Sequence, residues 1–140
     1  MQQYLRRIED ERNLLVELMA LYNAGQIEPF LAEHLDDVAF MTPDRLGTQK
    51  RGSGKSALRE DIRRFRGERG RLSVLDVIPL EGSISLLVDD EVRHRTVFCL
   101  KMRPNRLIER VTAFDVVPRL ARGALSPHPG GRAPRVLYSA

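Results

Sequence analysis

A histidine, a threonine and a phenylalanine alternate along one segment of this sequence in a way that suits a binding pocket. His94, Thr96 and Phe98 are two residues apart, so they share one face of a predicted strand, while Arg93 and Arg95 share the other. The face without cations should be buried, and a histidine there can act as a general acid or base. We therefore predict His94 as the catalytic candidate. A histidine that is simply hydrogen-bonded inside the protein is the alternative.

Polar and aromatic side chains elsewhere would complete a ligand-binding cavity with this strand. Tyr22 ends an amphipathic helix pattern, and Thr42 ends a short apolar strand. Both faces of the last predicted strand are mixed, so its orientation stays open. An inward Arg110 would need an anion or a cluster of hydrogen-bond acceptors, whereas an outward one would be solvated or lie in a dimer interface. The predicted ligand-binding residues are Tyr22, Thr42, Thr96, Phe98, Arg110, Thr112 and Phe114.

The glycine-rich run over residues 52–56 contains the second half of a phosphate-binding loop. That motif requires a glycine five residues before Gly54, and Gln49 stands there, so we interpret the run as the start of a helix. Three histidines and the single Cys99 show no metal-ligand spacing. His34 falls on the apolar face of a helix pattern, which favours a packed residue. We predict neither a metal nor a cofactor.

The elements that would position these residues follow from the periodicity of apolar side chains. Two segments with a helical period are followed by one strand-like segment, a third helical segment and four further strand-like segments. The short connections between these later strand-like segments favour antiparallel pairing. This order predicts an α+β, cone-shaped fold in which three N-terminal helices pack on a curved, mainly antiparallel sheet. Residues 43–53 are predicted to form a loop. The predicted helices span residues 3–23, 27–35 and 54–65, and the predicted strands span residues 38–42, 72–79, 83–88, 91–102 and 106–117.

Charge is distributed unevenly along the 140 residues, whose formal net charge is +4. From Pro118 onward there are four arginines and no acidic residue. Subtracting these four from the 23 lysines and arginines leaves 19, which equals the 19 aspartates and glutamates. A neutral body argues against a dedicated nucleic-acid binder. We predict a single domain over residues 1–117 and an extended or mobile tail over residues 118–140.

The sequence also carries signals of cellular location. No segment approaches the roughly 18 apolar residues of a membrane span. The first thirteen residues are rich in charge and lack the apolar core of a signal peptide. One cysteine cannot form an internal disulfide, which fits a reducing compartment. We therefore predict a cytoplasmic protein without a membrane segment.

Short structural motifs, most of them in the first half of the chain, carry a resemblance to a known family. They are Tyr22-Asn23-Ala24-Gly25, Phe30-Leu31, Asp36-Asp37-Val38-Ala39-Phe40, Arg51-Gly52 through Ala57-Leu58, and Leu107-Ile108. With these motifs the chain resembles the nuclear transport factor 2-like superfamily, in particular its SnoaL-like and ketosteroid-isomerase-like branch. The resemblance covers about residues 5–117. It implies a conical fold, a pocket between helices and sheet, and dimerisation through the outer sheet face.

The catalytic residues of the ketosteroid isomerases do not carry over. Those enzymes have a catalytic aspartate directly before a proline at the end of the first strand, whereas here Thr42 precedes Pro43. A threonine cannot serve as that base. The positions of their two oxyanion-hole residues, a tyrosine and a protonated aspartate, match Leu18 and Phe98. The Asp-Arg-Asp arrangement of the family's limonene epoxide hydrolases finds no match in the sequence either.

Two functions from different classes stay open at this stage. The first is a SnoaL-like protein that binds a small apolar or weakly polar molecule, either as a non-enzyme or as a cofactor-free isomerase, hydrolase, dehydratase or cyclase. In the enzyme, His94 would be the acid or base, and Arg110 or Thr42 would polarise the substrate. The second is a non-catalytic homodimeric interaction module that uses the outer sheet face and the basic tail. Association of the tail with nucleic acid is the remaining alternative.

Overall fold

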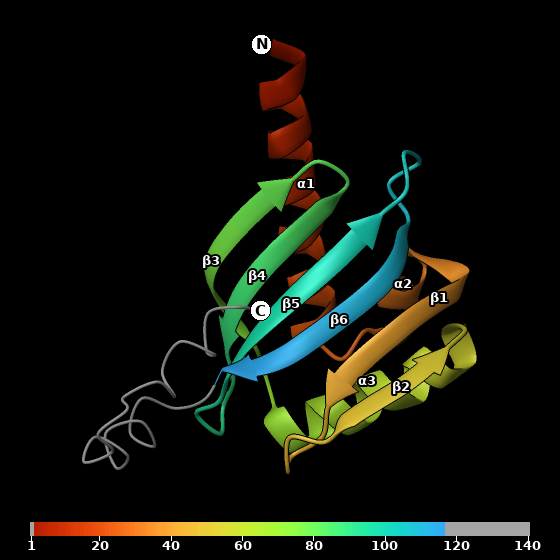
Figure 1. Ribbon diagram of the computed structural model, residues 1–140, viewed down its shortest axis with the longest axis vertical. Coiled ribbons are helices and arrows are strands. Elements are labelled where there is room, and N and C mark those ends of the chain that lie inside the picture. Colours follow the sequence, from red (N-terminus) through yellow and green to blue (C-terminus); the bar gives the residue numbers. More distant parts are fainter. Residues whose placement is uncertain (1, 117–140) are drawn as a thin grey trace, which may run out of the picture.

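The computed structural model describes residues 2–116, apart from the side chains of residues 3–5 and 7, and the predicted tail lies outside this part of the chain. Figure 1 shows its three helices and six strands. None of the helices within residues 2–116 is long and apolar enough to cross a membrane. The helices are α1 (Gln2–Asn23), α2 (Ile27–Leu31) and α3 (Lys55–Arg69), and the strands are β1 (His34–Pro43), β2 (Gln49–Ser53), β3 (Ser73–Leu80), β4 (Ser83–Asp89), β5 (Arg95–Met102) and β6 (Ile108–Val116).

Helix α1 packs on the sheet through one stripe of apolar side chains. Leu15, Leu18 and Tyr22 recur at helical spacing and are almost fully buried. The first part of the helix projects beyond the sheet (Figure 1). The helix ends close to Gly25, whose φ of 76° is a left-handed conformation that suits glycine. The prediction of a helix over residues 3–23 is confirmed.

The second predicted helix was too long at its C-terminal end. α2 ends at Leu31, and β1 already begins at His34. His34 pairs with Ile108 of β6, and the Ile108 N–H donates to the Glu33 carbonyl at 2.9 Å. Pairing with this distant strand provides partners for backbone groups that a further helical turn would otherwise have to satisfy. The sequence pattern alone could not show that pairing.

Helix α3 begins where the glycine-rich run predicted a helix, and it continues to Arg69 rather than ending at residue 65. Its Arg66 secures the end of α1. The Nε of Arg66 donates to the Tyr22 carbonyl at 2.9 Å, and its Nη2 donates to the Asn23 carbonyl at 3.0 Å. These are carbonyl groups at a helix C-terminus, where cations are favourable. The last turns of α3 therefore connect two helices.

The six strands form one mixed sheet in the order β2-β1-β6-β5-β4-β3, in which β1 and β6 are parallel and the other neighbours are antiparallel. The three helices lie on the same side of this sheet in Figure 1. The predicted α+β class is confirmed, but the predicted loop over residues 43–53 contains strand β2. The Oδ1 of Asp44 accepts the N–H groups of Leu46 and Thr48 at 2.8 and 2.9 Å, which closes the turn before that strand. Because β2 is a polar edge strand, it has little apolar periodicity.

A bulge in β6 decides which of its residues face the helices. Lys101 pairs with Arg110 while Met102 pairs with Ile108, so Glu109 is the extra residue. As a result Ile108 and Val111 are both buried on the inner face. The orientation that the sequence left open is therefore the outward one. The outward-facing side chains of β6 include Arg110, Thr112 and Phe114.

Candidate functional site

A small cavity lies between the helices and the inner face of the sheet. Its volume is about 50 Å³, which is room for a few water molecules and less than the roughly 150 Å³ of a cavity that holds benzene. Most of its lining is apolar. Within residues 2–116, no three His, Cys, Asp or Glu side chains are grouped to hold a metal ion. The polar side chains in the lining are those of Tyr22, His34, Thr42 and Asp61.

His34 contributes a hydrogen-bonding atom that nothing in the described chain uses. The residue is 1% exposed, and its Nδ1 lies 3.0 Å from the Phe30 carbonyl oxygen. A carbonyl oxygen only accepts, so Nδ1 carries the proton and Nε2 has a lone pair. The Nε2 atom is buried and has no hydrogen-bond partner among the described residues. His34 therefore lines the cavity and has one buried acceptor without a partner among the described residues.

The charge state of His34 follows from its burial. Loss of hydration lowers the pKa of His34 to about 4, although the bond to the Phe30 carbonyl acts in the opposite direction. The Phe30 ring packs against the imidazole, with 5.0 Å between the ring centroids. At neutral pH the imidazole is uncharged, and Nε2 remains an acceptor.

Thr42 and Asp61, in contrast, are held by each other and by Arg64. The Thr42 hydroxyl donates to Asp61 Oδ2 at 2.6 Å. The Nη2 of Arg64 donates to Thr42 Oγ1 and to Asp61 Oδ1, both at 2.8 Å. Because all three groups are engaged, this network joins α3 to β1 and fixes the orientation of Thr42 at the cavity wall.

Tyr22 also has its own partner within the described chain. Its hydroxyl donates to the Gly70 carbonyl at 3.1 Å. Burial raises the pKa of Tyr22 well above its ordinary value, so the phenol stays protonated. Its ring therefore contributes an apolar wall to the cavity, and its hydroxyl links the end of α1 to the segment after α3.

A second buried polar cluster lies outside the cavity lining, around Arg69. The two Nη atoms of Arg69 donate to the two carboxylate oxygens of Asp115 at 2.8 and 3.0 Å, and Nη1 lies 3.4 Å from Asp90 Oδ2. The Thr96 hydroxyl donates to Asp115 Oδ1 at 3.1 Å. An Asp-Arg-Asp arrangement thus exists in three dimensions, although no match was found in the sequence. Its members come from α3, from the turn after β4 and from β6, so no sequence spacing could indicate it.

The predicted site residues separate into groups in the structure. Tyr22, Thr42 and Phe98 line the cavity. Thr96 is buried on the inner face of β5, as its alternation with Arg95 predicted, but its hydroxyl belongs to the Arg69 cluster. These positions bring together part of the predicted set on one side of the sheet.

His94 does not lie on the inner face of a strand. β5 begins at Arg95, and Asp90 Oδ1 accepts the N–H groups of Val92 and His94 at 2.9 and 2.8 Å. The His94 side chain is 37% exposed, its Nδ1 lies 4.0 Å from Asp90 Oδ2, and it is not part of the cavity lining. The predicted strand began too early because a turn held by Asp90 interrupts the alternation on which the inward position of His94 depended.

Arg110 and Thr112 are separated from the cavity by the thickness of the sheet. They line a shallow groove of about 290 Å³ on the outer face, together with Cys99 and Lys101. Phe114 is half-buried on the same face, opposite Val97. These three residues therefore face away from the interior cavity.

Sequence reasoning missed His34, Asp61 and Arg69 as members of buried polar arrangements. A signal for two of them was present in α3. Asp61 follows the buried Leu58 by three residues, and Arg69 follows the buried Phe65 by four, so both fall on the apolar stripe of the helix. Both residues stand in a stretch rich in charged side chains, from residue 59 to 71, which conceals this periodicity in the sequence.

The three helices on one face of a six-stranded mixed sheet define an α+β protein. No family model and no curated protein matches the chain, but solved structures do. An NTF2-like protein of unknown function from Burkholderia xenovorans is 19% identical, with 87% of this chain and 94% of that one covered and a TM-score of 0.69.

Two further similar structures come from the ketosteroid-isomerase-like and SnoaL-like groups that the predicted resemblance named. A putative ketosteroid isomerase from Kribbella flavida is 23% identical, with 76% of this chain and 78% of that one covered and a TM-score of 0.64. A SnoaL-like protein of unknown function from Burkholderia thailandensis is 14% identical, with 74% and 92% covered and a TM-score of 0.59. At these identities the similarity shows a shared fold and leaves function to the site itself. The predicted resemblance is confirmed at that level.

Proposed function

We propose that this protein binds a small, largely apolar molecule that carries one hydrogen-bond donor, and that the interior cavity is its site. The observation that carries the proposal is the buried Nε2 of His34, which lacks a partner among the described residues. Leaving such an atom unpaired costs about 1–3 kcal/mol. A ligand hydroxyl or amine would remove that penalty on binding. The surrounding apolar wall favours hydrocarbon in the rest of the ligand.

The size of the cavity requires side chains to move when a ligand binds. Its volume of about 50 Å³ is below that of most ligand sites. Met19, Phe30 and Phe98 line the cavity and are only partly buried. Because these side chains have exposed surface, they can shift outward with less disruption than fully buried ones. We therefore propose an induced enlargement of the cavity along these three side chains.

The proposed chemistry is a cofactor-free isomerisation, hydrolysis, dehydration or cyclisation in which His34 takes the role that the sequence suggested for His94. The Nε2 atom would accept the proton of a ligand hydroxyl or of a water. A pKa of about 4 makes His34 a weak base. It would therefore act through a hydrogen bond that strengthens in the transition state, and not by removing the proton beforehand.

The proposal is tested by comparing phenol with benzene, which differ by one hydroxyl group. In ¹⁵N NMR spectra of the full-length chain, phenol should shift the Nε2 resonance of His34, and benzene should shift it much less. In binding titrations, the His34→Leu variant should no longer bind phenol more tightly than benzene, whereas the His94→Leu variant should still do so. Equal binding of the two compounds, or a response centred on His94, would contradict the proposal.

A second candidate function is a homodimeric interaction module that uses the outer sheet face. The observation that favours it is the apolar surface on that face, where Ile78 and Leu80 are more than half exposed and Val97 and Phe114 are half-buried. Sedimentation should then show a dimer that Val97→Asp dissociates. Removal of residues 119–140 should reduce partner binding if the basic tail takes part. A monomer at high concentration would count against this function.

A further inference from the structure

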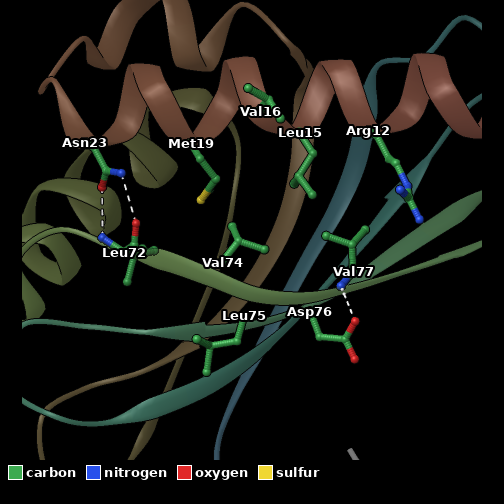
Figure 2. Close-up of a pocket in the computed structure, with 10 residues that line it drawn as sticks. All are labelled: Arg12, Leu15, Val16, Met19, Asn23, Leu72, Val74, Leu75, Asp76 and Val77. Carbon is green, nitrogen blue, oxygen red and sulfur yellow. Dashed lines mark hydrogen bonds between the residues drawn. The ribbon is translucent and has the colours of Figure 1, made fainter.

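A groove lies between α1 and β3 (Figure 2). Its volume is about 570 Å³, within the roughly 300–1,000 Å³ of small-molecule sites. Leu15 and Met19 point from α1 toward β3, and Val74 and Val77 point from β3 toward α1. A bulge in β3 turns Asp76 away from the helix. The floor of the groove is therefore apolar.

Met19 and Leu72 line both the groove and the cavity, so the two spaces meet at these side chains. The backbone of Leu72 is fixed, because its N–H donates to Asn23 Oδ1 at 2.8 Å and its carbonyl accepts from Asn23 Nδ2 at 3.0 Å. Met19 is only partly buried, and its unbranched side chain has three rotatable bonds. Of the two side chains that line both spaces, Met19 is therefore the one with more freedom to move.

Arg12 supplies a positive charge in the same groove. It lines the groove and is exposed, and no ion pair or hydrogen bond joins it to another described residue. Its side chain extends from α1 toward β3 in Figure 2. Arg12 and Met19 are seven residues apart on one helix, which is about 10 Å along the axis. A cation without a partner among the described residues, at that distance from an apolar opening, favours a ligand with an anionic head and an apolar chain.

We infer that groove and cavity form one site for a straight-chain carboxylate with a hydroxyl group at its far end. The carboxylate pairs with Arg12, the alkyl chain lies along α1 and passes Met19, and the terminal hydroxyl donates to Nε2 of His34. This inference rests on the proposed function, because it uses the same acceptor in the cavity. It adds the chemical class of the ligand and the route by which the ligand reaches His34.

Calorimetry on the full-length chain with 10-hydroxydecanoate, decanoate and 1,10-decanediol, all below micelle-forming concentrations, tests each contact. Arg12→Gln should weaken both carboxylates about fivefold, as expected for an exposed charge pair, and leave the diol unchanged. Arg6→Gln is the matched control, since Arg6 is exposed on the same helix and does not line the groove. His34→Leu should weaken 10-hydroxydecanoate and the diol but not decanoate.

Methionine methyl NMR locates the bound chain. The Met19 methyl should shift with 10-hydroxydecanoate, while that of Met41, on the outer face of β1, should stay in place. Equal weakening by Arg12→Gln and Arg6→Gln, or a shift at Met41 and none at Met19, would overturn the inference. So would a dimer in sedimentation that covers the groove and blocks all three ligands.

The inference and the proposed function fail in different ways. If phenol still shifts His34 but no carboxylate binds through Arg12 and Met19, the inference is overturned and the proposed function stands. If phenol leaves His34 unmoved and decanoate binds as well as 10-hydroxydecanoate, the contact with His34 is wrong, which overturns the inference together with the proposed function.

Discussion

His34 and Arg69 are equally buried, each 1% exposed, but their polar surroundings are opposite. Arg69 holds the carboxylate of Asp115 with two hydrogen bonds and lies close to that of Asp90. His34 has one bond to the Phe30 carbonyl, and its second ring nitrogen has no partner among the described residues. The Nε of Arg69 also has no partner among the described residues, but the charge of Arg69 is matched by carboxylates.

This difference separates a group that maintains the fold from a group that is available to a ligand. The Arg69 cluster connects α3, β5, β6 and the turn after β4, so substituting Arg69 would remove polar contacts among four parts of the structure. The Nε2 of His34 connects nothing within the described residues. A buried acceptor without a partner lowers stability, and it becomes favourable only when a donor reaches it. The comparison therefore predicts that substituting Arg69 lowers stability strongly and that substituting His34 changes stability little at neutral pH.

The largest effect is expected from Arg69→Met. The guanidinium of Arg69 lies 5.1 Å from the centroid of the Phe65 ring. Methionine keeps an apolar side chain near that ring, but it leaves Asp90 and Asp115 without their cation. Removing one partner of a buried ion pair costs about 3–5 kcal/mol. The free energy of unfolding, measured by urea titration, should fall by that amount.

Arg63→Met provides the control on the same helix. Arg63 is largely exposed and pairs with Glu60 on the surface at 3.1 Å, and such pairs contribute about 0–1 kcal/mol. Its loss should change the free energy of unfolding by less than 1 kcal/mol. Equal effects of the two substitutions would mean that the Arg69 cluster does not maintain the fold.

A smaller effect should appear as a pH dependence that comes from His34. Burial lowers the pKa of folded His34 to about 4, against 6.5 in the unfolded chain. Between these values the unfolded chain binds a proton that the folded chain does not. The free energy of unfolding should therefore fall as the pH decreases from 6.5 to 4, by about 3 kcal/mol in total. Above pH 6.5 this contribution should be constant.

Urea titrations at several pH values measure this slope, and His34→Leu shows which part of it belongs to His34. The variant lacks the titrating group, so its stability should vary less between pH 4 and 6.5 than that of the unchanged protein. His94→Leu, which alters a turn outside the cavity lining, should retain the slope. Parallel pH profiles for the unchanged protein and His34→Leu would contradict the low pKa of His34.

Much of the fold could be predicted because local periodicity was undisturbed there. The helix over α1 and the inner position of Thr96 and Phe98 follow from spacings of 3.6 and 2 residues. The errors lie where distant contacts overrule the local pattern. Pairing of His34 with β6 shortened α2, and a turn around Asp90 removed His94 from the strand.

The polar part of the candidate site was harder to predict for a related reason. Thr42, Asp61 and Arg64 meet because α3 packs on β1, so their hydrogen bonds depend on tertiary structure. His34 was recognised as a packed residue, but no sequence signal shows that one of its nitrogens lacks a partner. The outward position of Arg110 depends on a one-residue bulge, which alternation alone cannot reveal.

The smallest effect in the comparison is expected from His34→Leu at neutral pH. The substitution removes the bond to the Phe30 carbonyl, but that oxygen also accepts the Glu33 N–H at 3.2 Å and so keeps a partner. A hydrogen bond contributes about 0.5–1.5 kcal/mol, while relief of the unpartnered Nε2 returns about 1–3 kcal/mol. The two terms nearly cancel, so the free energy of unfolding at pH 7 should change by less than about 1 kcal/mol.

Below pH 5 the variant should be more stable than the unchanged protein, because it has no imidazole to protonate. A loss at pH 7 as large as that of Arg69→Met would show that His34 is part of the fold's structural support, and the distinction between the two buried residues would then be wrong.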